Sequence, residues 1–489
     1  MKLEKHHYLF LFIIFLFLGI VSTELFSDGM FMDGLIYADI SRNMAEGLGS
    51  FWKPHFTDTL FNVFYEHPPL AFGLQSIFFK LFGDNIYIER FYSLLTYVIV
   101  GCLIVLIWSK LTSDKKTGWL PLFLWLSTNY VTWALANNML ENTMSIFVCL
   151  SVLFYLNSFD KRRFLWIALS GLSLFLGLLT KGFFCLYIWS IPFFMWIFIG
   201  KRSFSKMIID NIIIVAFTII PIALLFFLVP DAQNNMLNYF YKQVIGSIQN
   251  VQTVNSRFFI IGAFFESIII PLIIGLIIII VSLKKDRNMA LFRENLSKFL
   301  MFFAIVLSGV IPIMISAKQS SFYILTVYPL FSVGLAYYLY PFINSIINNV
   351  KITPNSYVVF KKITIGIVFI SITMSVTQIN RIGREKNEVL ANKAIIDIVG
   401  RNTTINICPE MYIIWSLHGY MSRYGNISLD ENQNNKHQYY LSLENCNRQL
   451  LEDKYDLIPL KTKKYKLFKR KTTAKVKKNL TLKRYQYTR

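Results

Sequence analysis

The chain has 489 residues, of which 55% are hydrophobic and 16% are charged, and its mean hydropathy is +0.48. This composition excludes an ordinary soluble domain and indicates a polytopic α-helical membrane protein, because helices satisfy their own backbone polar groups in lipid. The formal net charge is +21, but we expect an anionic membrane surface rather than nucleic acid to be the partner of the basic segments.

Apolar segments recur along the chain at lengths near the roughly 20 residues that cross a hydrocarbon core. The first has a basic start but no small-residue cleavage site, which favours a retained signal anchor. The segments predict about eleven spans, near residues 8–25, 88–108, 119–136, 141–158, 164–180, 183–199, 207–229, 258–283, 298–316, 320–341 and 362–379.

The charges of the loops indicate how the chain is oriented in the membrane. With the N-terminus in the cytoplasm, the cytoplasmic loops all become basic: SKLTSDKKTG, FDKRR, GKRSFSK, KKDRNMALFRENLSK and NNVKITPNSYVVFKK. Lys and Arg concentrate in cytoplasmic loops, so a cytoplasmic N-terminus is predicted. An odd number of spans then places residues 380–489 outside.

The polar region after the last span has a pattern of its own. TTINICPE and QYYLSLE predict strands, and MYIIWSLHGYM predicts a helix between them. We therefore predict a transmembrane domain at 1–379, a small external α/β domain at 380–470 and a basic tail at 471–489, either solvated or bound to anionic lipid. Cys408 and Cys446 could form a disulfide if this region is exported.

The stretch FMDGLIYADISRNMAEG follows the first span and predicts a helix over 33–46. Its apolar residues recur every four positions, as in a helix lying along the membrane surface: Ile36, Ile40 and Met44. The remaining polar arc consists of Asp39, Arg42 and Glu46. Asp33 and Tyr37 share a different face. Taken alone, Asp33 is more often a helix N-cap than a catalytic acid.

A second polar stretch, FYEHPPL, places Glu66 and His67 directly before two prolines. Proline restricts the residue before it to extended conformations, so the segment can hold both side chains still. Glu66 could orient a basic group or bind a metal, and His67 could donate to a phosphate. A loop that only turns the chain into the next helix explains the stretch equally well.

Further charged residues lie at predicted outer ends of spans, namely Glu141, Lys181, Lys318 and, at the outer mouth of another span, Arg257. Each could be an ordinary interface anchor. Together with the first loop they suit a site for a phosphate-bearing lipid. The sequence has no GxxxxGK[ST] loop, no GxGxxG after a strand and no Asp-x-Asp pair, which argues against a nucleotide donor.

The stretches MDGLIYADISRNM, FYEHPPLAFGLQSIFFKLFGDNIYIERFYSLL, LTKGFF and YILTVYPL resemble the multi-spanning glycosyltransferases of the protein O-mannosyltransferase and lipid A aminoarabinose transferase group. The resemblance covers about residues 1–340. It implies the GT-C fold with surface helices in the first external loop, and a sugar donor on undecaprenyl phosphate or a similar polyprenyl phosphate. It implies inverting sugar transfer on the external face, with lipid A or another envelope glycolipid as the first acceptor and a protein hydroxyl as the alternative.

The resemblance also assigns roles to residues. Asp33 would be the catalytic acid, and the side chains that bind substrate or the donor phosphate would be Tyr37, Glu66, His67, Glu141, Lys181, Lys318 and Arg257. The sequence departs from the family pattern where Gly34 replaces a second acid, Ile36 replaces an arginine and His67 replaces a lysine. No metal or other cofactor is predicted, because the loop 230–257 contains no histidine. The protein is expected to be a monomer of the bacterial inner membrane.

Two other classes of function stay open at this point. A transporter or flippase for a lipid-linked sugar would use ionisable groups near the bilayer midplane, and Glu266 is the one mid-span acid. A membrane scaffold or sensor built around the external domain would need none of these groups.

Overall fold

The computed structural model describes residues 5–285, 289–349, 353–443, 446, 454–460, 462 and 464–471. The chain divides into two units, one of Met1–Thr57 and Phe61–Lys386 and the other of Asp58–Leu60 and Asn387–Arg489. The predicted basic tail lies outside the described residues except for Lys471.

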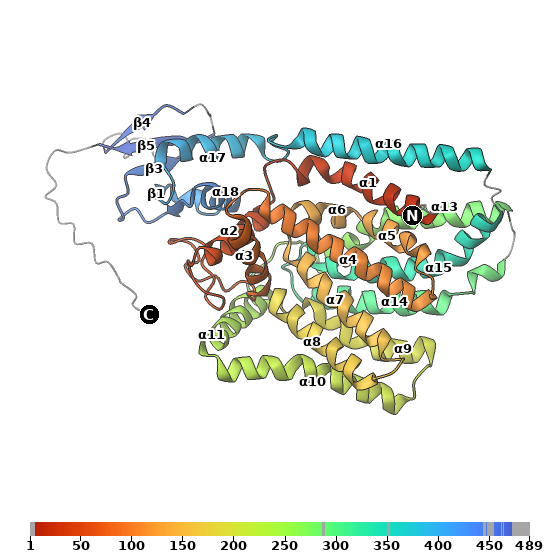
Figure 1. Cartoon of the computed structure of the whole chain (residues 1–489). Coiled ribbons are helices and arrows are strands. Elements are labelled where there is room, and N and C mark those ends of the chain that lie inside the picture. Colours follow the sequence, from red (N-terminus) through yellow and green to blue (C-terminus); the bar gives the residue numbers. More distant parts are fainter. Residues whose placement is uncertain are drawn as a thin grey trace. The chain divides into compact units, whose positions relative to one another are not determined.

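The first unit is a bundle of long apolar helices (Figure 1). Among the described residues, nine helical segments are long and apolar enough to cross a membrane. These are α1 (Lys5–Leu25), α4 (Ile88–Thr112), α7 (Leu140–Asn157), α8 (Arg163–Lys181), α10 (Phe204–Leu228), α13 (Phe259–Lys285), α14 (Leu296–Val310) with the 3₁₀ turn η5 (Ile311–Ile315), η6 (Ser321–Val327) with α15 (Tyr328–Asn349), and α16 (Pro354–Gln378).

The other two predicted spans are interrupted. One is split into α5 (Trp119–Leu126) and α6 (Asn129–Ala136), and the other combines the 3₁₀ segment η2 (Phe183–Ser190) with α9 (Ile191–Ile199). Since a 3₁₀ helix rises about 2.0 Å per residue and an α-helix about 1.5 Å, η2 and α9 together reach about 30 Å. The multi-pass architecture is confirmed, and the count of eleven stays a prediction.

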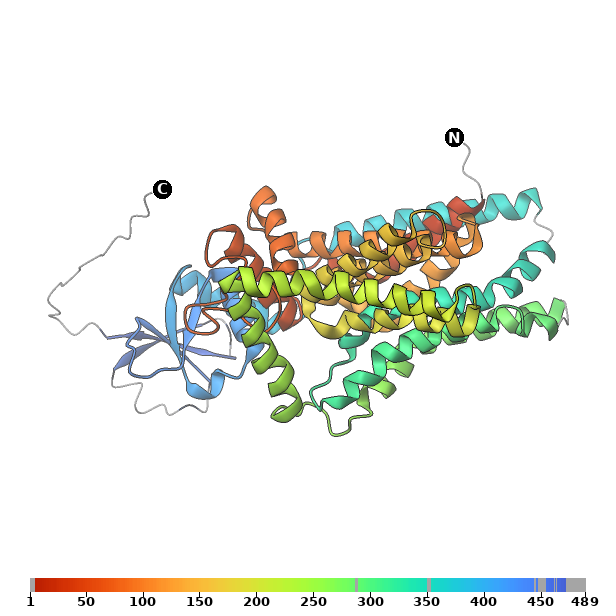
Figure 2. The same ribbon diagram turned by 90° about the horizontal axis from the view of Figure 1, so that it is seen from below.

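The first and last spans run side by side in the same direction (Figures 1 and 2). Tyr8 contacts Tyr357, and Phe12 contacts Phe360, with ring centroids 6.1 and 6.2 Å apart. Both helices therefore end on the same side of the unit. A backbone bridge there pairs Asp28 with Ile382. The chain thus leaves the bundle at the end that also carries the first long loop.

This loop contains two helices, α2 (Met32–Ala45) and α3 (Leu70–Phe82), which pack on each other. The helix predicted over 33–46 is present as α2, but two residues of its polar arc, Asp39 and Arg42, are buried, and only Glu46 is exposed. Asp39 and Arg42 form an ion pair with both side chains at most 2% exposed, and Asn43 donates to the backbone carbonyl of Phe56 at 2.8 Å. The long segment between α2 and α3 folds back on the helix, which periodicity alone does not reveal.

A third group of short helices lies in the loop after α10. It consists of α11 (Pro230–Asn238), the π-helix η3 (Tyr239–Ile245) and α12 (Gly246–Gln249). Lys53 of the first loop pairs with Asp231 at 2.7 Å, and Asn235 donates to the carbonyl of Trp52 at 3.1 Å. These contacts attach α11 to the first loop.

The second unit contains a five-stranded sheet of order β2-β1-β3-β5-β4, with two helices (Figure 1). Its elements are α17 (Lys386–Val399), β1 (Thr404–Ile407), α18 (Trp415–Gly425), β2 (Ser428–Asp430), β3 (Tyr439–Ser442), β4 (Tyr455–Ile458) and β5 (Lys466–Arg470). β1 pairs in parallel with β2 and β3, and β5 pairs antiparallel with β3 and β4. The predicted small α/β domain is present, and the two predicted strands and the helix correspond to β1, β3 and α18.

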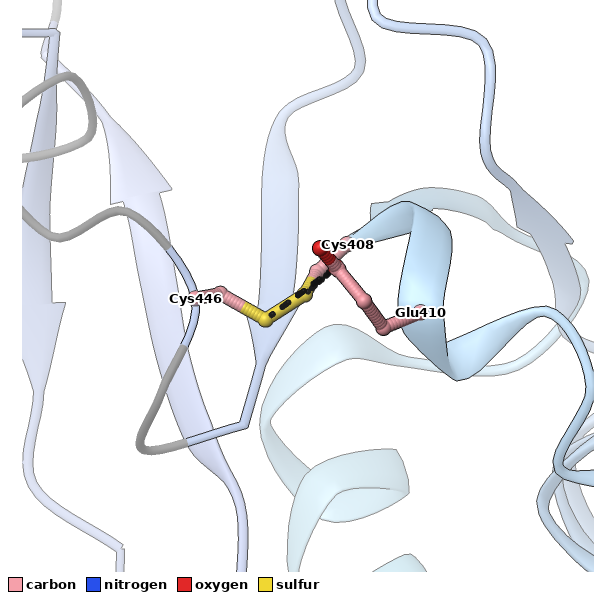
Figure 3. Close-up of side chains that lie close together, drawn as sticks. All are labelled: Cys408, Glu410 and Cys446. Carbon is pink, nitrogen blue, oxygen red and sulfur yellow. Dashed lines mark hydrogen bonds between the residues drawn. A yellow bond between two sulfur atoms is a disulfide. The ribbon is translucent and has the colours of Figure 1, made fainter.

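A disulfide joins Cys408, at the end of β1, to Cys446 (Figure 3). The Glu410 carboxylate lies beside it, with Oε2 2.9 Å from Sγ of Cys408. Because the two sulfur atoms are bonded to each other, they are not available as thiolate ligands for a metal. The sequence alone predicts this disulfide only if the region is exported.

Replacing both cysteines, Cys408→Ser with Cys446→Ser, should lower the stability of the second unit. The bond closes a loop of 38 residues, and the chain-entropy estimate for such a loop is about 4 kcal/mol. The measurement is the urea midpoint for protease cleavage after residue 387 in the full-length protein. Cys102→Ser is the control, since Cys102 is a free cysteine of the first unit. Equal midpoints for all three proteins would show that the disulfide contributes nothing.

Candidate active site

Asp33 lies in the first turn of α2 and is not its N-cap. The N-cap is Phe31, which makes no side-chain capping bond. Its backbone N–H instead donates to Oδ1 of Asn137 at 2.8 Å. The Asp33 carboxylate is therefore left to other partners, and the hydroxyl of Tyr37, one turn later, donates to it at 3.5 Å.

Gly34 brings the start of α2 against the segment that precedes α7. A Cβ atom at this position would lie 2.2 Å from the carbonyl oxygen of Asn137, closer than any side chain tolerates. The side chain of Asn138 donates to the Gly34 carbonyl at 3.2 Å and so fastens the two segments. A side chain at this position, such as the second acid that the resemblance would place here, therefore has no room.

The Glu66–His67 segment lies on the other side of Tyr37. The Tyr37 hydroxyl is 3.1 Å from Nε2 of His67. Nδ1 of His67 is buried without a hydrogen-bond partner among the described residues. Burial, with further contributions from Lys181 and Lys318, holds the pKa of His67 well below its usual value. The imidazole is therefore neutral, and it can donate one N–H but not a positive charge.

Glu141, in the first turn of α7, pairs with Lys181, the last residue of α8. Nζ of Lys181 lies 2.5 Å from Oε1 of Glu141, and the two side chains are 2% and 0% exposed. The ammonium also lies 5.3 and 5.5 Å from the ring centroids of Phe322 and Tyr323, within cation–π range. The second carboxylate oxygen, Oε2 of Glu141, is buried without a partner among the described residues. A buried charged oxygen of this kind is costly unless another group binds it.

Lys318 reaches the cluster through Gln243 of the π-helix η3. Nζ of Lys318 donates to Oε1 of Gln243 at 2.9 Å, and the same amide hydrogen-bonds the Glu66 carboxylate. A neutral glutamine thus bridges a cation and an anion. π-helical turns are rare and occur frequently at functional sites.

The charges of these groups influence one another. Burial raises the pKa of Asp33, and Lys181 and Lys318 oppose that rise. Burial also raises the pKa of Glu66, again opposed by Lys318. The two lysines can contact an anionic group, the unpartnered Oε2 of Glu141 can accept a hydrogen bond from a hydroxyl, and the Asp33 carboxylate can accept a proton.

The structure thus brings together seven of the eight residues singled out from the sequence: Asp33, Tyr37, Glu66, His67, Glu141, Lys181 and Lys318. Arg257 is exposed and donates to the carbonyl of Ile315 at 2.7 Å. Among the described residues it makes no ion pair with the other seven. Gln243 and Tyr323 were missed, because nothing in NYFYKQVI or SSFYIL marks them out.

Comparisons with known proteins find local sequence matches and a shared fold. Residues 66–226 match the family model described as dolichyl-phosphate-mannose-protein mannosyltransferase. The chain is 30% identical over 178 residues to the undecaprenyl phosphate-alpha-4-amino-4-deoxy-L-arabinose arabinosyl transferase of Wigglesworthia glossinidia brevipalpis, a match covering 35% of this chain and 31% of that protein. The enzyme of the same name from Pseudomonas savastanoi pv. phaseolicola is 24% identical over 159 residues. This match covers 32% of this chain and 28% of that protein. The matched segments thus span about a third of these curated relatives.

The fold is shared over nearly the whole chain. The crystal structure of ArnT from Cupriavidus metallidurans bound to undecaprenyl phosphate superposes with a TM-score of 0.65, covering 95% of this chain and 98% of that one, at 12% identity. The crystal structure of the same protein in the apo state superposes with a TM-score of 0.64, covering 93% of this chain and 97% of that one, at 13% identity. The chain thus shares the fold of these ArnT structures over nearly its whole length, and its local sequence matches are to glycosyltransferases of the kind that its motifs resemble.

Proposed function

We propose that the protein is an inverting glycosyltransferase that moves a sugar from a polyprenyl-phosphate donor to an acceptor on the external face of the membrane. The observation that carries this proposal is the cluster in which Lys181 and Lys318 both act on the charge of Asp33 and Lys181 also forms a buried pair with Glu141. A carboxylate can take the proton of an acceptor hydroxyl, and cations can neutralise the phosphate that leaves.

In the proposed reaction, the acceptor oxygen attacks the anomeric carbon and the bond from that carbon to the phosphate oxygen breaks. Asp33 takes the proton of an acceptor hydroxyl, or orients the acceptor if the attacking group is a phosphate that needs no base. Lys181 and Lys318 neutralise the phosphate that leaves with both bonding electrons. His67, being neutral, contributes an N–H donor, and Tyr37 holds it in place.

We propose lipid A or another envelope glycolipid as the acceptor, with a protein hydroxyl as the alternative. The names of the aminoarabinosyl transferases above give the donor class, a sugar on undecaprenyl phosphate, and the description of the matching family model names a protein as acceptor. The proposed location is the bacterial inner membrane, with a cytoplasmic N-terminus. The disulfide supports export of the second unit, since such bonds persist in oxidising compartments.

The transporter alternative depends on Glu266 of α13. This side chain is exposed on the outside of the bundle and makes no ion pair among the described residues. A transported substrate would need it to face an interior path. The geometry therefore favours the enzyme.

Mass spectrometry of lipid A, other envelope glycolipids and glycoproteins, from cells with and without the gene, tests the function. We expect loss of a single hexose, hexosamine or aminopentose from one of these classes, most readily from lipid A. Loss of the sugar from a glycoprotein alone would mean that the acceptor is a protein and not a glycolipid. An unchanged envelope, with the protein expressed in the control cells, would contradict the proposal.

The dependence of transfer on pH should report the environment of Asp33. The rate constant kcat/KM should fall as the pH falls through the raised pKa of Asp33, because only the carboxylate can accept a proton. Lys318 lowers that pKa, so Lys318→Gln should move the acid limb to higher pH. Arg257→Gln is the matched control and should leave the midpoint in place. An acid limb that does not move in Lys318→Gln would rule out this assignment.

A further inference from the structure

An apolar groove lies between α1, α4 and the α5–α6 pair of the first unit. Its volume is about 570 Å³, within the roughly 300–1,000 Å³ of small-molecule sites. Three of its lining residues are also exposed on the outside of the bundle, Ile14 by 44%, Val98 by 54% and Leu106 by 42%. Because α1 and α4 are membrane spans, the groove opens sideways into hydrocarbon.

The length of the groove matches one leaflet of a bilayer. Its lining runs along α1 from Phe10 to Val21 and along α4 from Leu94 to Leu106. At 1.5 Å per residue these stretches are about 16 and 18 Å long. Half of a hydrocarbon core of about 30 Å is about 15 Å. Both stretches are centred on their helices, so the groove crosses the bilayer midplane, and it can hold one extended hydrocarbon chain that enters from one side and passes the midplane.

A positive charge marks one end of this groove. Lys115, just after α4, is the one charged residue that lines it within the part of the chain that the structure describes. The opposite end of α4 lies beside the first loop, where Arg90 donates to the carbonyl of Gly29 at 2.6 Å. Lys115 and the Asp33 cluster are therefore at opposite ends of the helices. A phosphate bound by Lys115 belongs to a different molecule from a phosphate bound in the candidate active site.

We propose that the groove binds an acyl chain of an anionic phospholipid from the leaflet opposite the active site, with its phosphate paired to Lys115. The bound chain supports α6. Tyr97 lines the groove, and its hydroxyl donates to the carbonyl of Val131 in α6 at 2.5 Å. The residue after α6 is Asn137, whose side chain accepts from Phe31 at the start of α2. The lipid thus stabilises the segment that holds Asp33, whatever reaction the site performs.

Photo-crosslinking in nanodiscs tests the proposal on the full-length protein. The probe is phosphatidylglycerol with a diazirine in one acyl chain, in a phosphatidylcholine background, and the cross-links are mapped by mass spectrometry. We expect them to concentrate on 10–21 and 94–106. Lys115→Gln should lower cross-linking there about fivefold, since one basic residue near an anionic lipid is worth about that factor. The control is Lys161→Gln, an exposed lysine of another loop, which should cross-link as the wild type does.

A second pair of variants tests the groove itself. Val98→Trp fills the mouth and should lose these cross-links, whereas Ile212→Trp, on the exposed face of α10, should keep them. Cross-links spread evenly over all lipid-facing helices, or equal losses in Lys115→Gln and Lys161→Gln, would overturn the proposal. Competition by undecaprenyl phosphate would also overturn it, because the occupant would then be a polyprenyl chain.

The wild-type protein provides a measurement that needs no substitution. Cys102 lines the groove and is exposed, whereas the free cysteines Cys149 and Cys185 are buried. Phosphatidylglycerol added to delipidated protein should slow alkylation of Cys102 by N-ethylmaleimide more than phosphatidylcholine does. Equal protection by the two lipids would remove the proposed role of Lys115.

Discussion

Asp33→Asn should reduce sugar transfer by roughly 10²- to 10⁴-fold, the usual contribution of a general base. The amide has nearly the same shape as the carboxylate but cannot accept the proton. The fold should persist, because the side chain does not cap α2 and its hydrogen bond from Tyr37 is a long one, at 3.5 Å. The measurement is the turnover of purified protein with the donor sugar identified by mass spectrometry.

The matched control for this variant is Asp231→Asn. Asp231 is an exposed carboxylate in α11 that pairs with Lys53, outside the cluster around Asp33. The Asp231→Asn variant should keep the rate of sugar transfer within a few fold of the wild type. Full activity in Asp33→Asn, with the protein folded, would show that Asp33 does not take the proton and would remove the catalytic assignment.

Lys181→Met should produce the largest combined loss of stability and activity. It leaves the Glu141 carboxylate buried and unpaired, and breaking a buried ion pair in this way costs about 3–5 kcal/mol. The same change removes a cation from beside Asp33. The melting temperature in detergent and the transfer rate should both fall.

A double variant separates these two effects. Glu141→Met with Lys181→Met removes both charges, and replacing a buried pair by apolar residues of similar size is often neutral for stability. The melting temperature should therefore return toward that of the wild type, while transfer should stay low. A double variant that regains activity would show that Lys181 serves only the fold. One that stays as unstable as the single variant would show that the ion pair is not the cause.

The residues of this cluster can be picked out from the sequence because they lie close to chain landmarks. Asp33 and Tyr37 are one turn apart in a short helix, and Glu66 and His67 are fixed by two prolines. The predicted number of spans between these residues then puts the loops that carry them on the same side of the membrane. The contacts between spans cannot be predicted in this way. The pairing of Glu141 with Lys181 depends on α7 and α8 packing side by side, which periodicity within each helix does not contain.

Other features lie beyond pattern reading for different reasons. The π-helix that presents Gln243 depends on tertiary contacts, such as the bond from Lys318, rather than on local propensity. The strands β2, β4 and β5 are three to five residues long, and they are not among the strands predicted from the sequence. Gly34, which at first is only a departure from the family pattern, is explained by the close approach of the Asn137 carbonyl.

Direct binding of undecaprenyl phosphate tests the central claim, that the cluster around Asp33 binds a polyprenyl phosphate. The measurement is its dissociation constant for the full-length protein in detergent, with undecaprenol as the comparison. Charge-assisted hydrogen bonds are worth about 1.5–3 kcal/mol, so Lys318→Gln should weaken binding of the phosphate roughly tenfold or more and leave undecaprenol unaffected. Equal affinities of wild-type protein for the two lipids, or no change in Lys318→Gln, would contradict the account.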